Sequence, residues 1–231
     1  MSTATPWPAG AHGAAMLSFN LMPSRWLHAS RWAALLPAGW EPPADGDGAR
    51  HRHCSALILR HLGPASEAVT DWQRPEWPLA LLPAARWTQL LRRLGLLPMQ
   101  RRLRHTIRGD EARTLAAAVP PADLAWVRGP VPRVAAAATL QRWLAAQDEA
   151  LATLPLSAHG AALPGLGAAL LAQATGPAPA PMRARLALRA PDAAEAIDAG
   201  AAAGPEAAFA LVLSVLEELD PPWLSSFPGS R

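Results

Sequence analysis

The 231-residue sequence contains no lysine and no tyrosine, a single cysteine, and three phenylalanines. Because Cys54 is the only cysteine, no disulfide can form within the chain, which fits a reducing compartment. Without lysine, every permanent side-chain cation is an arginine, and each can form planar, bidentate pairs with carboxylates or phosphates. The formal net charge is only +3, so overall charge alone does not favour a polyanionic partner.

Long apolar runs are also missing. No stretch approaches the roughly 18 consecutive apolar residues that mark a bilayer-spanning helix. Residues 1–15 are rich in Ala, Gly, Pro and Thr, and they lack the basic segment and the apolar segment of a cleaved signal peptide. We therefore expect a mobile N-terminal tail over 1–15 and a cytoplasmic protein without a transmembrane segment.

What the sequence does contain is typical of a folded helical protein. Hydrophobic residues make up 51% and charged residues 17%, and ten tryptophans supply most of the aromatic side chains. Pro- and Gly-rich segments separate stretches with helical spacing. We predict an all-α fold, an irregular multi-helix globular bundle with Pro-rich connecting loops. It forms a single domain over 16–231, or two lobes divided near 173–181, where the sequence reads QATGPAPAP.

The strongest helical pattern follows Pro83, where Trp87, Leu90, Leu91 and Leu94 recur at helical spacing and Gly95 is expected as the C-cap. Other helices are predicted at 23–37, 55–62, 98–107, 110–119, 134–154, 161–172 and 205–219. Residues 182–189 alternate apolar side chains with arginine, which fits a short strand and a helix equally well.

Two catalytic or metal-binding alternatives have weak support. His51, His53, Cys54 and His61 are the densest set of possible metal ligands, but they lack the paired spacing of zinc sites. We interpret His51, His53, Cys54 and His61 as part of a solvated basic turn. Ser157 beside His159 lacks the surroundings of a nucleophilic serine. We predict no cofactor, no bound metal and no enzymatic activity.

Positive charge is concentrated in the segment from Arg86 to Arg113. This segment contains eight arginines and two acids, which gives a net charge of +6 from these residues. Pro191–Asp220 contains seven acids and no base. The segregation suggests a docking surface for a partner. The candidate partner-binding residues are Arg92, Arg93, Arg101, Arg102, Arg104, Arg108, Glu217 and Glu218.

Two hypotheses explain this segregation. The arginines could bind nucleic acid, in a helical nucleic-acid-binding or regulatory protein, although the acidic C-terminal segment would repel a phosphate backbone. Alternatively, opposite charges pair within the protein or with a protein partner. Glu217, Glu218 and Asp220 lie at the expected C-terminal end of the last helix, where each interacts unfavourably with the helix dipole unless a cation compensates. We favour charge pairing and expect no nucleic-acid partner.

Two blocks of sequence carry a family resemblance. They are FNLMPSRWLHASRWAALLP at Phe19–Pro37 and LLPAARWTQLLRRLGLLPMQRRLRHTIRGDEARTL at Leu81–Leu115, followed more loosely by RLALRAP, the last helix and PPWLSSF. On these blocks the chain resembles the SctK (YscK-like) family of type III secretion accessory proteins.

The resemblance implies a cytoplasmic, all-helical, non-enzymatic adaptor of the sorting platform in the injectisome, the virulence-associated protein-transport apparatus. Members link the cytoplasmic domain of the inner-membrane ring protein SctD to the platform protein SctQ. The implied location is the cytoplasmic face of the inner-membrane apparatus, reached through these partners.

Overall fold

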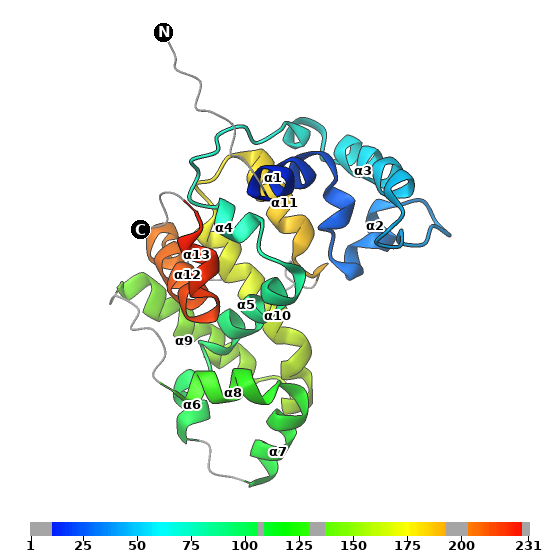
Figure 1. Cartoon of the computed structure of the whole chain (residues 1–231). Coiled ribbons are helices and arrows are strands. Elements are labelled where there is room, and N and C mark those ends of the chain that lie inside the picture. The colour runs from blue at the N-terminus through cyan, green and yellow to red at the C-terminus, as the bar shows by residue number, and fades with distance from the viewer. Residues whose placement is uncertain (1–10, 106–108, 130–136, 193–202, 228–231) are drawn as a thin grey trace. The chain divides into compact units, whose positions relative to one another are not determined.

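The protein is described by a computed structural model covering residues 11–105, 109–129, 137–192 and 203–227. These residues form thirteen α-helices, three short 3-10 helices and no strand (Figure 1). The all-α prediction is therefore confirmed. Within the same ranges, no helix combines the length and apolar character required to cross a lipid bilayer.

The chain forms two compact units, and both are discontinuous in sequence. Unit 1 combines Met1–Ala84, Ala178–Pro191 and Pro222–Arg231, and unit 2 combines Ala85–Pro177 and Asp192–Pro221. One passage between units lies at Pro177 and Ala178, inside the Pro-rich segment 173–181. Two further passages, at Pro191 and Asp192 and at Pro221 and Pro222, bound the acidic segment, and each unit is a composite of distant segments.

Unit 1 is built mostly from short helices, with α3 as the longest, and its core includes Phe19 and Trp77, whose rings meet edge to face with centroids 5.7 Å apart. Both side chains are buried. The elements are α1 (Ala11–Leu21), η1 (Pro23–Arg25), η2 (Ala29–Arg31), α2 (Trp32–Leu35), α3 (Gly48–Leu62), η3 (Gly63–Ser66), α4 (Trp77–Ala80), α11 (Ala180–Arg189) and most of α13 (Pro221–Ser225).

The N-terminal part of unit 1 differs from the prediction in two places. Helix α1 begins at Ala11, so helical structure reaches into the range 1–15 for which a mobile tail was expected. The single helix expected over 23–37 is divided into η1, η2 and α2. The division occurs because His28 is extended, with ψ 143°, and its imidazole accepts a hydrogen bond from the backbone N–H of Ser30.

Helix α3 is longer than predicted, because Asp47 caps it by accepting a hydrogen bond from the Arg50 backbone N–H at 2.9 Å. The interpretation of His51, His53, Cys54 and His61 as a solvated turn is therefore wrong. All four lie in α3, where His51 and Cys54 are buried and the other two are exposed.

The ambiguous segment 182–189 is helical and belongs to α11. Its buried side chains include Met182, Arg185, Leu186 and Arg189, which share one face of a helix. Burial of two arginines is what concealed the helical pattern in the sequence, since arginine is normally assigned to the solvent face.

Unit 2 contains seven of the helices, including α10, which at 19 residues is the longest of those described. They are α5 (Ala84–Leu96), α6 (Gln100–His105), α7 (Gly109–Ala118), α8 (Pro121–Arg128), α9 (Ala138–Ala152), α10 (Leu156–Ala174) and α12 (Pro205–Leu219). Helix α10 packs against α7 and α12. The apolar stripe predicted for α5 is confirmed, because Trp87, Leu90, Leu91 and Leu94 are all buried. The expected helix 134–154 corresponds to α9, while α8 was not anticipated.

Gly95 does not act as the predicted C-cap, since α5 continues to Leu96. A β-carbon on Gly95 would lie 2.0 Å from the carbonyl oxygen of Leu163 in α10. A β-carbon on Gly167 in α10 would lie 1.9 Å from the carbonyl oxygen of Leu91. The two glycines therefore allow α5 and α10 to pack backbone against backbone.

Candidate functional site

Arg92 and Arg93, two of the candidate docking residues, bind a buried carboxylate inside unit 2. Their Nε atoms lie 3.0 Å and 3.2 Å from the two carboxylate oxygens of Asp123 in α8. Asp123 is completely buried, and Gln89 donates a third hydrogen bond to it at 3.2 Å. Since a buried carboxylate needs such partners, these two arginines stabilise the packing of α5 against α8.

Helix α12 joins the same network through Trp126. The guanidinium of Arg93 stacks over the Trp126 ring at 5.0 Å, and the indole N–H donates to Glu218 Oε2 at 2.6 Å. At the end of α12, Asp220 Oδ2 lies 3.5 Å from Arg86 Nε. Arg86, from the 86–113 segment, thus compensates part of the acidic end of α12 within the protein, one of the two arrangements expected from the sequence.

The arginines of α6 divide into bound and free residues. Arg102 Nη2 lies 3.1 Å from Asp148 Oδ1 in α9, and Arg104 donates to the carbonyl oxygen of Gly129. Arg101 is exposed and its side chain makes no hydrogen bond or ion pair within the described ranges. Arg108 lies outside the described residues.

Of the two candidate acids, only Glu218 has a partner. Glu217 is exposed, and among the described residues its carboxylate has no hydrogen bond or ion pair. The predicted docking set therefore separates into internal contacts at Arg92, Arg93, Arg102, Arg104 and Glu218, and two available charges at Arg101 and Glu217.

Sequence reasoning missed Asp123 and Trp126, which organise this network. Both lie about thirty residues beyond the arginines that they contact, in a helix that was not predicted. The one available signal was the placement of an acid in the first turn after Pro120 and Pro121, where a carboxylate favours helix formation.

Arg185 was also missed, and it connects separate segments of unit 1. It is 2% exposed, and its guanidinium donates to the carbonyl oxygens of Asn20 at 3.2 Å, Ala65 at 3.1 Å and Ser66 at 2.7 Å. These acceptors belong to α1 and η3. Burial lowers the pKa of Arg185.

Arg189, one turn further along α11, has a similar role. It donates to the carbonyl oxygens of Leu79, at 3.2 Å, and of Ala80 and Leu82, and its guanidinium stacks over Trp26 at 4.9 Å. Burial lowers the pKa of Arg189 to about 9, so the side chain remains charged at neutral pH. Arg185 and Arg189 use the planar guanidinium fork to satisfy backbone groups in the core.

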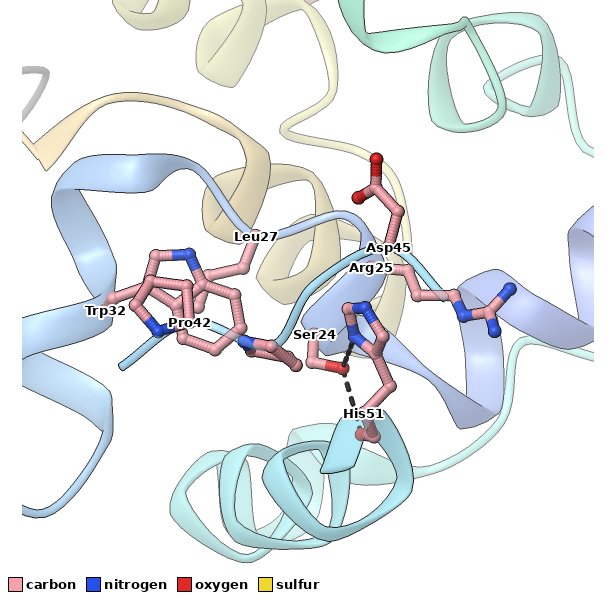
Figure 2. Close-up of a pocket in the computed structure, with 8 residues that line it drawn as sticks. Ser24, Arg25, Leu27, Trp32, Pro42, Asp45 and His51 are labelled. Carbon is pink, nitrogen blue, oxygen red and sulfur yellow. Dashed lines mark hydrogen bonds between the residues drawn. The ribbon is translucent and has the colours of Figure 1, made fainter. Parts of the chain in front are cut away.

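A polar hollow of about 450 Å³ opens in unit 1 between η1, α2, the connector after Pro37 and the start of α3. We call it the Trp32 hollow; it is lined by Ser24, Arg25, Leu27, Trp32, Pro42, Pro43, Asp45 and His51. Figure 2 shows Trp32 and Pro42 at one end of the hollow and Arg25 and Asp45 at the other, with Ser24 and His51 between them.

Ser24 and His51 are close enough to resemble a nucleophile and its base, with Ser24 Oγ 2.9 Å from His51 Nδ1. However, Ser24 Oγ donates its proton to the His51 carbonyl oxygen at 2.9 Å. The hydroxyl also lies 2.8 Å from Ser55 Oγ and is buried. A nucleophilic serine must instead donate to the imidazole and face the substrate. The arrangement fits a structural hydrogen-bond cluster.

The environment of His51 favours the neutral imidazole. Burial lowers the pKa of His51, and the nearby Arg25 guanidinium lowers it further. Asp45, Asp47 and the backbone of Ala44 raise the pKa without reversing the shift. The imidazole is therefore an uncharged part of the hollow at neutral pH.

The other residues considered for metal binding or catalysis have different surroundings. Exposed His53 stacks on Trp40 with centroids 5.2 Å apart, and burial raises the pKa of the Cys54 thiol. His159 is buried in α10, with Nε2 2.9 Å from the carbonyl oxygen of Leu151. Across the described ranges, no three His, Cys, Asp or Glu side chains converge in a group suited to a metal ion.

Comparison of the chain with protein-family models, curated proteins and solved structures finds no match in any of the three.

Proposed function

We propose that this protein is a non-enzymatic adaptor of the type III secretion sorting platform. In this role it links the cytoplasmic domain of an SctD-like inner-membrane ring protein to an SctQ-like platform protein at the cytoplasmic face of the apparatus. The proposal rests on the resemblance of Phe19–Pro37 and Leu81–Leu115 to the SctK family, and it requires neither a cofactor nor a catalytic site.

The observation that best supports it is the division of the chain into two compact helical units. The first block of resemblance lies in unit 1, and all but the first four residues of the second lie in unit 2. A linker needs two independent surfaces, and each unit can provide one. The rigid backbone packing of α5 against α10 would keep the unit 2 surface well ordered.

Each unit also presents charged side chains that remain available for a partner. On α3 of unit 1, Arg50, Arg52 and Arg60 are exposed and make no side-chain hydrogen bond or ion pair within the described ranges. Unit 2 offers Arg101 and Glu217. Charges of this kind give a protein–protein contact its orientation and partner choice more than its affinity.

The nucleic-acid alternative gains nothing from the geometry. It depended on the arginines between Arg86 and Arg113, and Arg92, Arg93, Arg102 and Arg104 already contact protein groups. Releasing them to bind phosphate would leave Asp123 buried without its cations.

Binding of the purified full chain to each partner tests the proposal. We expect isothermal titration calorimetry to show one-to-one complexes with the SctD-like cytoplasmic domain and with the SctQ-like protein, and size-exclusion chromatography to show all three together. Arg101→Glu and Glu217→Arg should each weaken one complex, whereas Arg142→Glu, at an exposed position of α9 outside the candidate set, should have no effect.

Two outcomes would contradict the adaptor role. One is the absence of binding to both secretion proteins under conditions in which the chain is folded. The other is tight binding to generic duplex DNA with a strong salt dependence. The logarithm of the binding constant would then fall steeply and linearly with the logarithm of the salt concentration, as expected when arginines neutralise phosphates.

A further inference from the structure

We propose that the Trp32 hollow binds a short peptide segment of a protein partner, with an apolar side chain at one end and a carboxylate and a cationic group next to each other at the other end. This inference is independent of the adaptor role, because it rests only on the side chains that line the hollow. It identifies a binding site in unit 1 that the segregation of charge along the sequence did not indicate.

One end of the hollow is apolar. Trp32 and Leu27 are half-buried, and Pro43 is buried beside exposed Pro42 in the connector. An indole together with proline rings forms the type of surface on which extended peptides dock, since these groups are rigid and lose little entropy on binding. This end is suited to an aliphatic side chain of the peptide.

The other end carries two opposite charges. The Arg25 and Asp45 side chains are exposed, and neither makes a hydrogen bond or ion pair within the described part of the chain. The guanidinium can bind a carboxylate through two parallel hydrogen bonds, and the Asp45 carboxylate can accept from a cation. A ligand with one charge of each sign would satisfy both groups, whereas a ligand with a single charge would face one repulsive neighbour.

The middle of the hollow is preorganised. Ser24 and His51, which are buried, are held by the hydrogen bonds that connect η1 to α3. Ser24 also uses its backbone N–H to donate to Ser55 Oγ at 3.3 Å. Because these groups already have partners, they offer a fixed surface and lose no hydrogen bond when a ligand enters.

The shape favours a peptide over a free small molecule. The hollow has a volume of about 450 Å³ and opens to solvent. Small molecules are usually enclosed over most of their surface. A peptide segment needs less enclosure, because the protein that carries it contributes further contacts outside the hollow.

Capped peptides can test the proposal with the folded full-length chain. The probes are acetyl-Leu-Gly-Glu-Arg-amide, the same peptide with Glu and Arg exchanged, a neutral version with Gln at both charged positions, and free leucine. Binding is followed by NMR through the Trp32 indole N–H signal, assigned with Trp32→Phe, and through the imidazole signals of His51.

We expect one of the two bipolar peptides to give saturable shifts at Trp32 and His51, with affinity about fivefold higher than the neutral peptide. This factor corresponds to two exposed charge pairs at a few tenths to one kcal/mol each. Trp32→Ala should remove binding. The charge-exchanged variant, Arg25→Asp with Asp45→Arg, should prefer the peptide with the opposite order of charges.

Arg60→Glu is the matched control, since it changes an exposed arginine of α3 that does not line the hollow. Its peptide binding should equal that of the unmodified chain. Circular dichroism establishes that each variant remains folded, which is expected because Arg25 and Asp45 are exposed.

Four results would overturn the proposal. They are the absence of saturable shifts up to the solubility limit, equal binding of neutral and bipolar peptides, unchanged peptide preference in the charge-exchanged variant, and equal binding of free leucine, which would indicate a small-molecule site. None depends on SctD-like or SctQ-like proteins, so failure here would leave the adaptor role standing, and the reverse also holds.

Discussion

Gly95 in α5 faces the carbonyl oxygen of Leu163 in α10 so closely that a β-carbon would lie 2.0 Å from it. No rotamer can relieve this contact, because it involves the backbone of one helix and the first side-chain atom of the other. Gly167 repeats the relationship in the opposite direction, with its β-carbon position 1.9 Å from the Leu91 carbonyl oxygen. The packing of the two helices therefore depends on glycine at both positions.

Gly95→Ala should destabilise unit 2 by about 3 kcal/mol, because α5 and α10 must separate to accept the methyl group. The clash must outweigh the gain of about 1 kcal/mol that alanine normally brings to a helix interior. Hydrogen exchange of amides in α5 and α10 measures the effect within unit 2. Gly109→Ala is the control, since no packing neighbour among the described residues lies within 4 Å of its β-carbon position, and it should leave exchange in α5 and α10 unchanged. Equal protection in both variants would contradict the close packing.

The apolar stripe of α5 could be predicted from sequence, whereas the role of Gly95 could not. A stripe depends on spacing within one segment, and the period of an α-helix makes Trp87, Leu90, Leu91 and Leu94 visible together. The meaning of Gly95 depends on Leu163, which is 68 residues away and belongs to another helix. Near the end of a helical stretch, a glycine is expected both at a C-cap and at a position where another helix packs closely against the backbone.

The same distinction explains the errors in unit 1. The alternation in Met182–Leu188 was ambiguous because arginine is normally a surface residue, whereas Arg185 and Arg189 are buried. Their acceptors are backbone carbonyl groups of α1, η3 and the segment around α4, and sequence patterns contain no information about such acceptors. The division at His28 depends on a local hydrogen bond to Ser30 that helical propensity does not reveal.

The predicted docking set was incomplete for a related reason. An arginine-rich segment indicates positive charge but not whether that charge is free. Arg92 and Arg93 both bind the carboxylate of Asp123, which is about thirty residues away and buried. The Trp32 hollow was missed because its lining comes from η1, α2, the connector and α3, and no one of these segments carries a recognisable motif.

Arg189→Lys should destabilise unit 1 by about 3 kcal/mol, although it preserves the charge. A single ammonium group cannot reproduce the planar fork that donates to Leu79, Ala80 and Leu82. Urea denaturation followed by circular dichroism measures the change. Arg60→Lys, at an exposed position in the same unit, should change stability by less than about 0.5 kcal/mol. If the two variants are equally stable, the buried guanidinium of Arg189 contributes no more to the free energy of unfolding than the exposed guanidinium of Arg60.

Glu218→Arg and Glu217→Arg form a matched pair at neighbouring positions of α12. Glu218 accepts the Trp126 indole hydrogen bond at 2.6 Å, while Glu217 is exposed. The Glu218 variant should lose about 1 to 2 kcal/mol of unit 2 stability, since it removes this bond and places a second cation near Arg93. The Glu217 variant should be close to neutral in stability.

Trp126 fluorescence would be obscured by the other tryptophans, so the indole N–H signal in NMR spectra is the direct measurement of the Glu218 contact. A large shift of that signal is expected in the Glu218 variant and a small shift in the Glu217 variant. Equal effects of the two substitutions on stability and on the indole signal would show that the acidic end of α12 has no specific internal partner.

The stability of unit 1 should fall as the pH is lowered, because the pKa of His51 is below the usual histidine value in the folded state. In the unfolded chain the pKa of His51 is about 6.5, so below this pH the unfolded chain binds more protons than the folded chain. The free energy of unfolding therefore rises with pH, and the stability from the neutral imidazole is lost as pH falls through this region. His28 contributes with the same sign, since burial and Arg31 lower its pKa and its imidazole must stay unprotonated at Nδ1 to accept from Ser30. Urea denaturation between about pH 7 and pH 5 measures the slope of the free energy of unfolding against pH.

His51→Gln should reduce that slope, by at most about 1.4 kcal/mol per pH unit for one proton. His53→Gln, at an exposed position two residues further along α3, should leave the slope unchanged. A slope that is the same in the two variants would show that protonation of His51 is not coupled to folding.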